Sequence, residues 1–206
     1  MSATLSRVDQ ARIAEAIRMS ESRTSGEIVC VLAETAAIQA TALPVMLAAV
    51  TALVLPWLLL ATTRLSVQAM LSLQGAAFLA ALALGCMPVV RRLLTPPAVR
   101  RALAWRLAAE QFVVRGLART ADRNGILIFV SRAERYARII ADEGIARHVP
   151  QAQWQTAVDA LVEHMRQDRP ADGFIAAIAI CSDVLAHRFP AREVPSNVLP
   201  DRVYQI

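Results

Sequence analysis

Two long stretches without a charged residue interrupt an otherwise ordinary pattern of polar and apolar positions. No formal charge occurs between Glu34 and Arg64, or between Arg64 and Arg91. Each stretch can hold the roughly 20 apolar residues of a membrane-spanning helix. The pattern predicts spans at about residues 43–61 and 71–90, joined near Arg64 as an antiparallel hairpin. The alternative, a buried soluble hairpin, would need a very large core around two charge-free helices.

The segments on both sides of this hairpin alternate between helical and strand-like patterns. Short apolar runs rich in β-branched residues predict buried strands, and apolar residues three or four positions apart predict amphipathic helices. The predicted strands are 27–33, 126–130 and 135–141, and the predicted helices are about 6–23, 97–121, 151–167 and 172–188. In the helix that follows Pro96 and Pro97, the expected apolar stripe is Leu103, Leu107, Val114 and Leu117.

The order of these segments predicts an α/β class protein, an α/β/α sandwich with a small mixed sheet that a two-helix transmembrane hairpin interrupts. A helix between the first two strands favours a parallel crossover, and the short turn at 131–134 makes the next pair antiparallel. The expected parts are residues 1–36 and 93–190 as two pieces of one domain, with 37–92 as the hairpin. Prolines at 190, 195 and 200 predict an irregular tail over 191–206.

The composition agrees with a membrane protein. Hydrophobic residues make up 56% and charged residues only 19% of the chain, against about a quarter charged in soluble domains. Disorder is excluded, since disordered chains are polar. The three cysteines are far apart and form no CxxC pair, which excludes a disulfide scaffold and a thiolate zinc site.

The arginine distribution predicts the orientation of the hairpin. The segment 91–120 contains seven arginines against one glutamate, and the segment before the first span is rich in charges and has no signal-peptide core. The positive-inside rule then places both termini in the cytoplasm, with the Arg64 turn outside, for a multi-pass protein of the bacterial inner membrane. This explains the arginines without nucleic-acid binding. We expect contacts with the bilayer and its anionic headgroups near Arg91, Arg92, Arg100 and Arg101.

The tight turn between the second and third strands carries further charges. Arg132 and Arg135 are expected to extend the same basic surface, because the first strand leads into the membrane at this end of the sheet. Glu134, on the same turn, is expected to be solvated or to pair with a helix.

Several sequences outside the hairpin resemble the TPM-domain family. They are RNGILIFVS (123–131), IIAD (139–142), DGF (172–174), HRFP (187–190) and LPD (199–201). The resemblance implies an α/β/α domain, with relatives among thylakoid-lumen proteins of photosystem repair and bacterial membrane-tethered proteins, some described as acid phosphatases or calcium binders. Two features depart from the family. A GYG-like turn is replaced by ADEG at 141–144, and the anchor interrupts a domain that the charges place inside the cell.

Three carboxylates are predicted to meet at one end of the sheet. The antiparallel turn brings Asp122 near Asp142 and Glu143, with Arg123 beside them. Such an oxygen-rich group suits Ca²⁺ or Mg²⁺, and a metal there could assist phosphoryl transfer. The alternative is structural, with Asp122 opening a turn and Asp142 or Glu143 capping the next segment.

The sequence contains no established catalytic motif. No GxSxG, P-loop or dinucleotide fingerprint occurs, and His148, His164 and His187 lack metal-ligand spacing. Whether the protein is an enzyme therefore stays open. The favoured function is a non-enzymatic assembly, repair or quality-control factor with an unidentified protein partner. The alternative is a metal-dependent acid phosphatase using Asp122, Asp142 and Glu143.

Overall fold

The computed structural model of the chain describes residues 5–35, 66–87, 95–120, 122–191 and 199–206, with residues 45–46, 48–52, 54, 58 and 90 between them. The chain divides into two compact units, residues 1–36 together with 101–206, and residues 37–100. Arg64, Arg91, Arg92 and much of the first predicted span lie outside the described residues.

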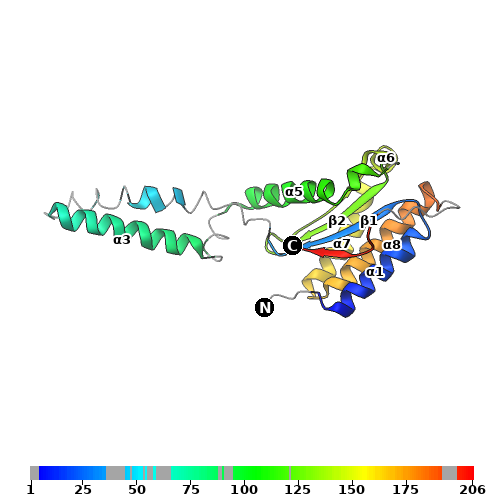
Figure 1. The fold of residues 1–206 in the computed structure, drawn as a ribbon, viewed down its shortest axis with the longest axis horizontal. Coiled ribbons are helices and arrows are strands. Elements are labelled where there is room, and N and C mark those ends of the chain that lie inside the picture. Colours follow the sequence, from blue (N-terminus) through cyan, green and yellow to red (C-terminus); the bar gives the residue numbers. More distant parts are fainter. Residues whose placement is uncertain are drawn as a thin grey trace. The chain divides into compact units, whose positions relative to one another are not determined.

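A four-stranded mixed sheet forms the centre of the first unit (Figure 1). Its strands are β1 (Glu27–Ala33), β2 (Gly125–Ser131), β3 (Tyr136–Ala141) and β4 (Val203–Gln205), in the spatial order β3-β2-β1-β4. β1 pairs with β2 and β4 in parallel, and β2 pairs with β3 antiparallel. The parallel first pair, the antiparallel second pair and the mixed α/β class are confirmed.

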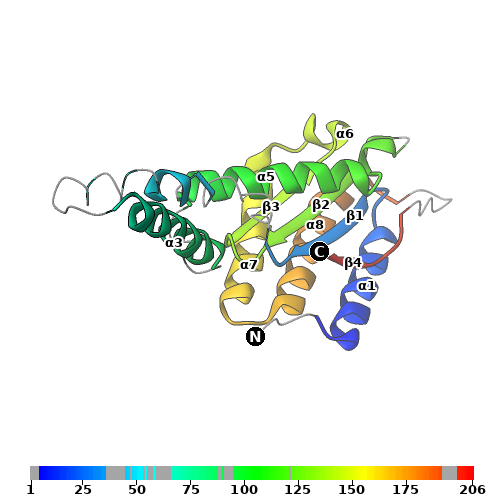
Figure 2. The ribbon, with the colours of Figure 1, turned by 60° about the vertical axis from the view of Figure 1, so that its left-hand side comes forward.

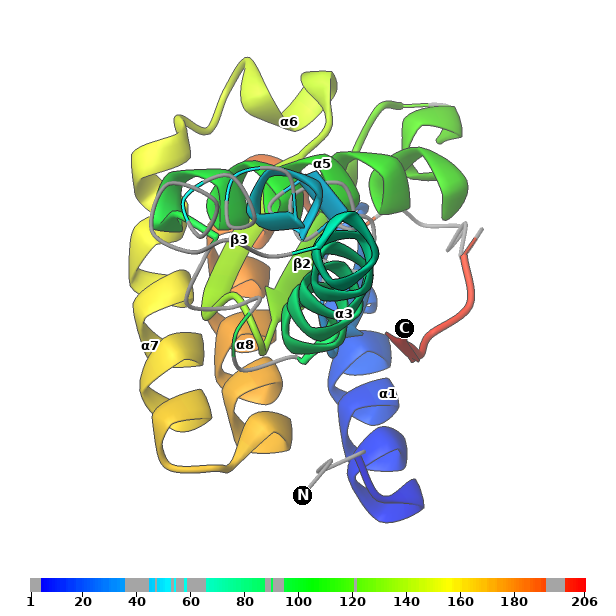
Figure 3. The same cartoon turned by 90° about the vertical axis from the view of Figure 1, so that its left-hand side faces the viewer.

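Helices cover both faces of this sheet (Figures 2 and 3). Every residue of β1 and β2 is buried, and alternate residues enter two separate cores. The larger core lies against α1 (Arg7–Glu21), α7 (Gln155–Arg166), which follows the 3₁₀-helix η3 (Gln151–Trp154), and α8 (Pro170–Arg188). The smaller core lies against α5 (Pro97–Val114). Burial on both faces explains why these two strands are continuous apolar runs.

α5 differs from the prediction in its length and in the face that it buries. It ends at Val114, because the chain turns at Gly116, whose φ of 82° favours glycine, into the 3₁₀-helix η2 (Leu117–Arg119). The predicted stripe is shifted, since Ala104, Ala108 and Gln111 are buried whereas Val114 is 63% exposed. Small alanine side chains allow a helix to lie close to a sheet, and the buried face of α5 contains Ala104 and Ala108.

The C-terminal tail is not wholly irregular as predicted. Residues 203–205 form β4 on the open edge of β1, and the N–H of Ile206 donates to the carbonyl of Leu32 at 3.0 Å. The short helix α6 (Glu143–Ala146) after β3 was also not predicted.

The second unit contains α3 (Val67–Cys86), which carries no charged residue. Among the described residues one helix, α8, is long and apolar enough to cross a membrane, and α3 contributes a shorter apolar stretch, Gln68–Leu84. α8 is a core helix of the first unit, because Phe174, Ile178 and Leu185 are fully buried. The predicted two-helix transmembrane hairpin is therefore not confirmed.

Candidate functional site

The predicted carboxylates lie where β2 begins and β3 ends. Ile126 pairs with Ala141, and the N–H of Asp142 donates to the carbonyl of Gly125 at 2.8 Å. Gly144 packs tightly here, since an added Cβ would lie 2.6 Å from the carbonyl oxygens of both Asp122 and Arg123. The backbone of Asp122 thus lies beside the segment that carries Asp142 and Glu143, as the strand register requires.

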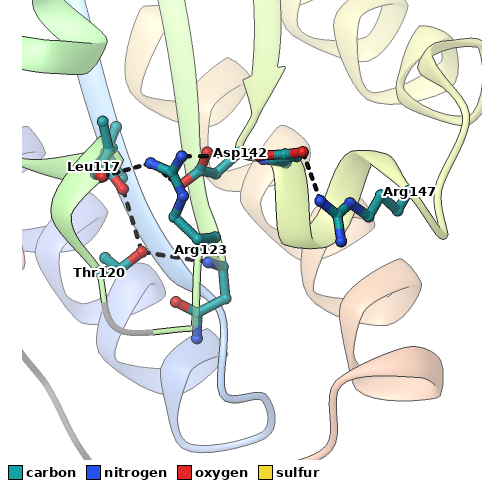
Figure 4. Close-up of polar contacts among 8 residues, drawn as sticks. Leu117, Thr120, Arg123, Asp142 and Arg147 are labelled. Carbon is teal, nitrogen blue, oxygen red and sulfur yellow. Dashed lines mark hydrogen bonds and ion pairs between the residues drawn. The ribbon is translucent and has the colours of Figure 1, made fainter.

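Arginines surround two of the three carboxylates. The guanidinium of Arg123 lies 3.9 Å from Asp142 and 3.7 Å from Glu143, and it donates to the carbonyl of Ala118 at 2.7 Å. Arg147 contacts Glu143 at 2.6 Å and, as its donor, lowers the pKa of that carboxyl. Figure 4 shows Arg123 between the loop after α5 and Asp142.

The carboxylate of Asp142 has a structural role. It is the N-cap of α6 and accepts the N–H of Glu143 at 2.7 Å, which satisfies one of the free donors at a helix start. This arrangement corresponds to the structural alternative for Asp142.

Nothing in this arrangement favours a divalent cation. Guanidinium groups already contact Asp142 and Glu143, two of the three carboxylates that a metal would need. Among the described residues no group of three or more His, Cys, Asp or Glu side chains is placed to hold a metal ion. The structure therefore gives no support to a metal site at Asp122, Asp142 and Glu143.

A second group of carboxylates, which the sequence analysis missed, lies where β1 begins. Glu21, at the end of α1, accepts the N–H of Ile28 at 3.0 Å, and Glu27 accepts the N–H of Leu199 at 3.3 Å. Burial, together with the neighbouring Glu27 and Asp201, raises the pKa of Glu21 from 4.5 to about 9. The signal in the sequence was spacing, because Glu21 follows the buried Ile13 and Ile17 at intervals of four residues.

We call this end of the sheet, where β1 and β2 begin and β3 ends, the acidic end. Its members are Glu21, Glu27, Asp142, Glu143 and Asp201. Backbone N–H groups donate to Glu21, Glu27 and Asp142, so these carboxylates hold neighbouring segments of the chain together.

The opposite end of the sheet contains a buried glutamate. Glu134, on the turn between β2 and β3, is 8% exposed and accepts hydrogen bonds from the hydroxyls of Ser131 and Thr35. Of the two roles predicted for Glu134, the solvated one is wrong, because the side chain is buried and these hydroxyls compensate for its burial. The bond from Thr35 fastens the turn to the segment that follows β1.

The described cysteines do not provide a reactive thiol. Cys30 and Cys181 are both fully buried. Burial raises the pKa of Cys181 to about 12 and that of Cys30 well above its ordinary value. Since the thiolate is the reactive form, these side chains serve the core.

Two comparisons with known proteins find matches. A family model described as the TPM domain matches residues 96–184. The NMR structure of the BA42 protein from the psychrophilic bacterium Bizionia argentinensis is similar, with a TM-score of 0.62 and 18% sequence identity over 100% of this chain and 98% of that chain. At this identity the likeness shows the fold alone. No curated protein matches the sequence.

Proposed function

This chain belongs to the TPM-domain family, and on that premise we propose that it is a membrane-tethered assembly, repair or quality-control factor. Its α/β domain would act by binding a protein partner and would catalyse no reaction of its own. The observation that carries this proposal is the engagement of Asp142 and Glu143 by Arg123 and Arg147, which leaves these candidate catalytic carboxylates in structural roles.

The second unit supports the membrane tether. α3 runs for 20 residues without a charge, and its apolar side chains face outward, with Leu71 64% and Leu79 66% exposed. Exposed apolar surface of this kind marks a site that another apolar phase covers. In the same unit Ala48 and Ala52 are buried, and small residues four apart are typical of helices that pack inside a bilayer.

The charge distribution supports the orientation. Seven arginines in the segment 91–120 follow the apolar region directly, so the α/β domain and both termini would lie in the cytoplasm of a bacterial cell. Arg91, Arg92, Arg100 and Arg101 would then contact anionic headgroups of the inner membrane.

The membrane part of the proposal is tested by fractionating cells that express the full chain. We expect the protein to stay in the membrane pellet after alkaline carbonate extraction, and a reporter inserted at Arg64 to be accessible only from the periplasmic side. Release into the supernatant, or a cytoplasmic reporter, would overturn the tether or its orientation.

The proposal that the protein catalyses no phosphatase reaction is tested with the same protein purified in detergent. Phosphatase turnover is measured with and without Ca²⁺, Mg²⁺ and Mn²⁺ for the wild type, Asp122→Ala and the control Asp159→Ala, which changes an exposed aspartate on α7. We expect the same background rate in all three. Metal-dependent turnover that Asp122→Ala alone abolishes would establish the phosphatase alternative.

A further inference from the structure

A pocket of about 510 Å³ lies where β2 turns into β3, beside the last turns of α7. Its apolar lining comes from two strands and one helix, and consists of Val130, Ala137, Val162 and Met165. Its polar lining consists of Ser131, Arg132, Arg135, Tyr136 and Arg166. We call it the arginine pocket. Its volume is within the range usual for small-molecule sites, and all its residues belong to the α/β unit.

The three arginines differ in how far other residues already neutralise them. Arg132 lies 3.7 Å from Glu34 and 3.4 Å from Asp168, and Arg166 lies 3.4 Å from Glu163. Arg135 is exposed and forms no ion pair within the described part of the chain. The carboxylates that pair with Arg132 and Arg166 are themselves exposed, and Arg135 is the guanidinium most available to a ligand.

The backbone at the pocket is strained at Arg135 and at Asp168. The φ of Arg135 is 50°, in the left-handed region, and Asp168, which pairs with Arg132, has a φ of 56°. Glycine and asparagine adopt this conformation more readily than arginine. Strained residues of this kind cluster at ligand sites. Here the strained residues are Arg135, which lines the pocket, and Asp168, which pairs with the lining residue Arg132.

We propose that the arginine pocket binds an organic phosphate, a phosphate monoester that carries an apolar group. Guanidinium groups donate paired hydrogen bonds to phosphate oxygens, so Arg135 with Arg132 and Arg166 would hold the phosphate. The apolar lining would hold the remainder of the ligand. Both a soluble phosphate ester and the headgroup of phosphatidic acid have this chemistry.

The test uses the full chain in a non-ionic detergent at low salt. Calorimetry measures the binding of phenyl phosphate, inorganic phosphate and micelle-embedded phosphatidic acid. The variants are Arg135→Gly, which suits the left-handed backbone and is expected to fold, and Arg166→Gln. The control is Arg119→Ala, which removes an arginine before β2, at the opposite end of the sheet.

We expect one of the two esters to bind at least tenfold more tightly than inorganic phosphate. Arg135→Gly should weaken that binding at least tenfold and Arg166→Gln several-fold, with no change for Arg119→Ala. Binding of phenyl phosphate identifies a soluble ligand, and binding of phosphatidic acid alone identifies a lipid. The proposal is overturned if no probe saturates, if inorganic phosphate binds as tightly as the esters, or if Arg135→Gly and Arg119→Ala have equal effects.

This inference is independent of the membrane tether and of the protein partner. The pocket needs residues 130–166 of the α/β unit only. A soluble protein in the fractionation experiment would leave the pocket intact, and failure of the binding experiment would leave the tether intact.

Discussion

At the acidic end of the sheet, backbone N–H groups donate to Glu21, Glu27 and Asp142, whereas at the opposite end Arg135 has no carboxylate partner among the described residues. The carboxylates are occupied in holding the fold together, and the arginine faces a pocket. A cluster of charges therefore indicates a ligand site only when its members are not already used by the chain itself.

The largest effect expected at the acidic end is the pH dependence that Glu21 confers. Its pKa is raised from 4.5 to about 9, so the folded chain binds more protons than the unfolded chain between these values. Its stabilising contribution is complete below pH 4.5 and is lost as the pH rises through about 9. We expect the unfolding free energy to fall by up to about 1.4 kcal/mol per pH unit in this window.

Glu21→Gln should flatten this profile, because glutamine stays neutral at every pH. Urea unfolding followed by circular dichroism at pH 5, 7 and 9 measures the slope. Glu15→Gln removes an exposed carboxylate from the same helix and serves as the control. If Glu21→Gln keeps the wild-type slope, the buried carboxylate is not what couples folding to pH.

A smaller loss is expected from Gly144→Ala. The added methyl group would lie 2.6 Å from two backbone carbonyl oxygens, which cannot move without disturbing the start of β2. Overpacking of this kind costs about 1–3 kcal/mol, measured as a shift of the urea midpoint. Gly75→Ala, with no atom within 4 Å of the added Cβ, should cause no loss. Equal effects of the two substitutions would show that the acidic end tolerates rearrangement.

Substitutions of Asp142 distinguish a helix-capping role of its side chain from a metal-binding role. Asp142→Ala removes the acceptor at the start of α6 and should cost about 1 kcal/mol of unfolding free energy, whereas Asp142→Asn keeps an acceptor and should cost only a few tenths. Thermal unfolding with and without Ca²⁺ measures both. A Ca²⁺-dependent rise in Tm that both variants abolish would make the acidic end a metal site after all.

The sequence was informative where burial is continuous along the chain. The apolar runs at 27–33 and 126–130 predicted β1 and β2, since strands buried on both faces carry few polar residues. β4 escaped prediction because three residues after a proline form a strand only when the edge of β1 is available to them. The buried face of α5 was shifted because Ala104 and Ala108 give a weaker apolar signal than the leucines beside them.

The candidate site was harder to predict because the partners of its charges are distant in sequence or depend on backbone conformation. The strand register places the backbone of Asp122 beside the segment that carries Asp142 and Glu143. The ion pairs of Arg123 with Asp142 and Glu143 depend on the φ of 54° at Arg123. No local sequence pattern specifies this backbone conformation. The sequence predicts a solvated or helix-paired Glu134, because its partner Thr35 lies 99 positions away and no local pattern reveals it.

The smallest expected change in unfolding free energy comes from replacing Arg123 or Arg135 by glycine. Both residues have a left-handed backbone, and they lie at opposite ends of the sheet. Arg135→Gly relieves the strain and removes no ion pair within the described residues, so we expect a gain of about 0.5–1 kcal/mol. Arg123→Gly relieves the same strain but removes contacts with Ala118, Asp142 and Glu143. We therefore expect no gain, or a loss, for Arg123→Gly. Parallel urea titrations measure both variants, and a loss at Arg135 would show that its guanidinium, like that of Arg123, serves the fold and is not free for a ligand.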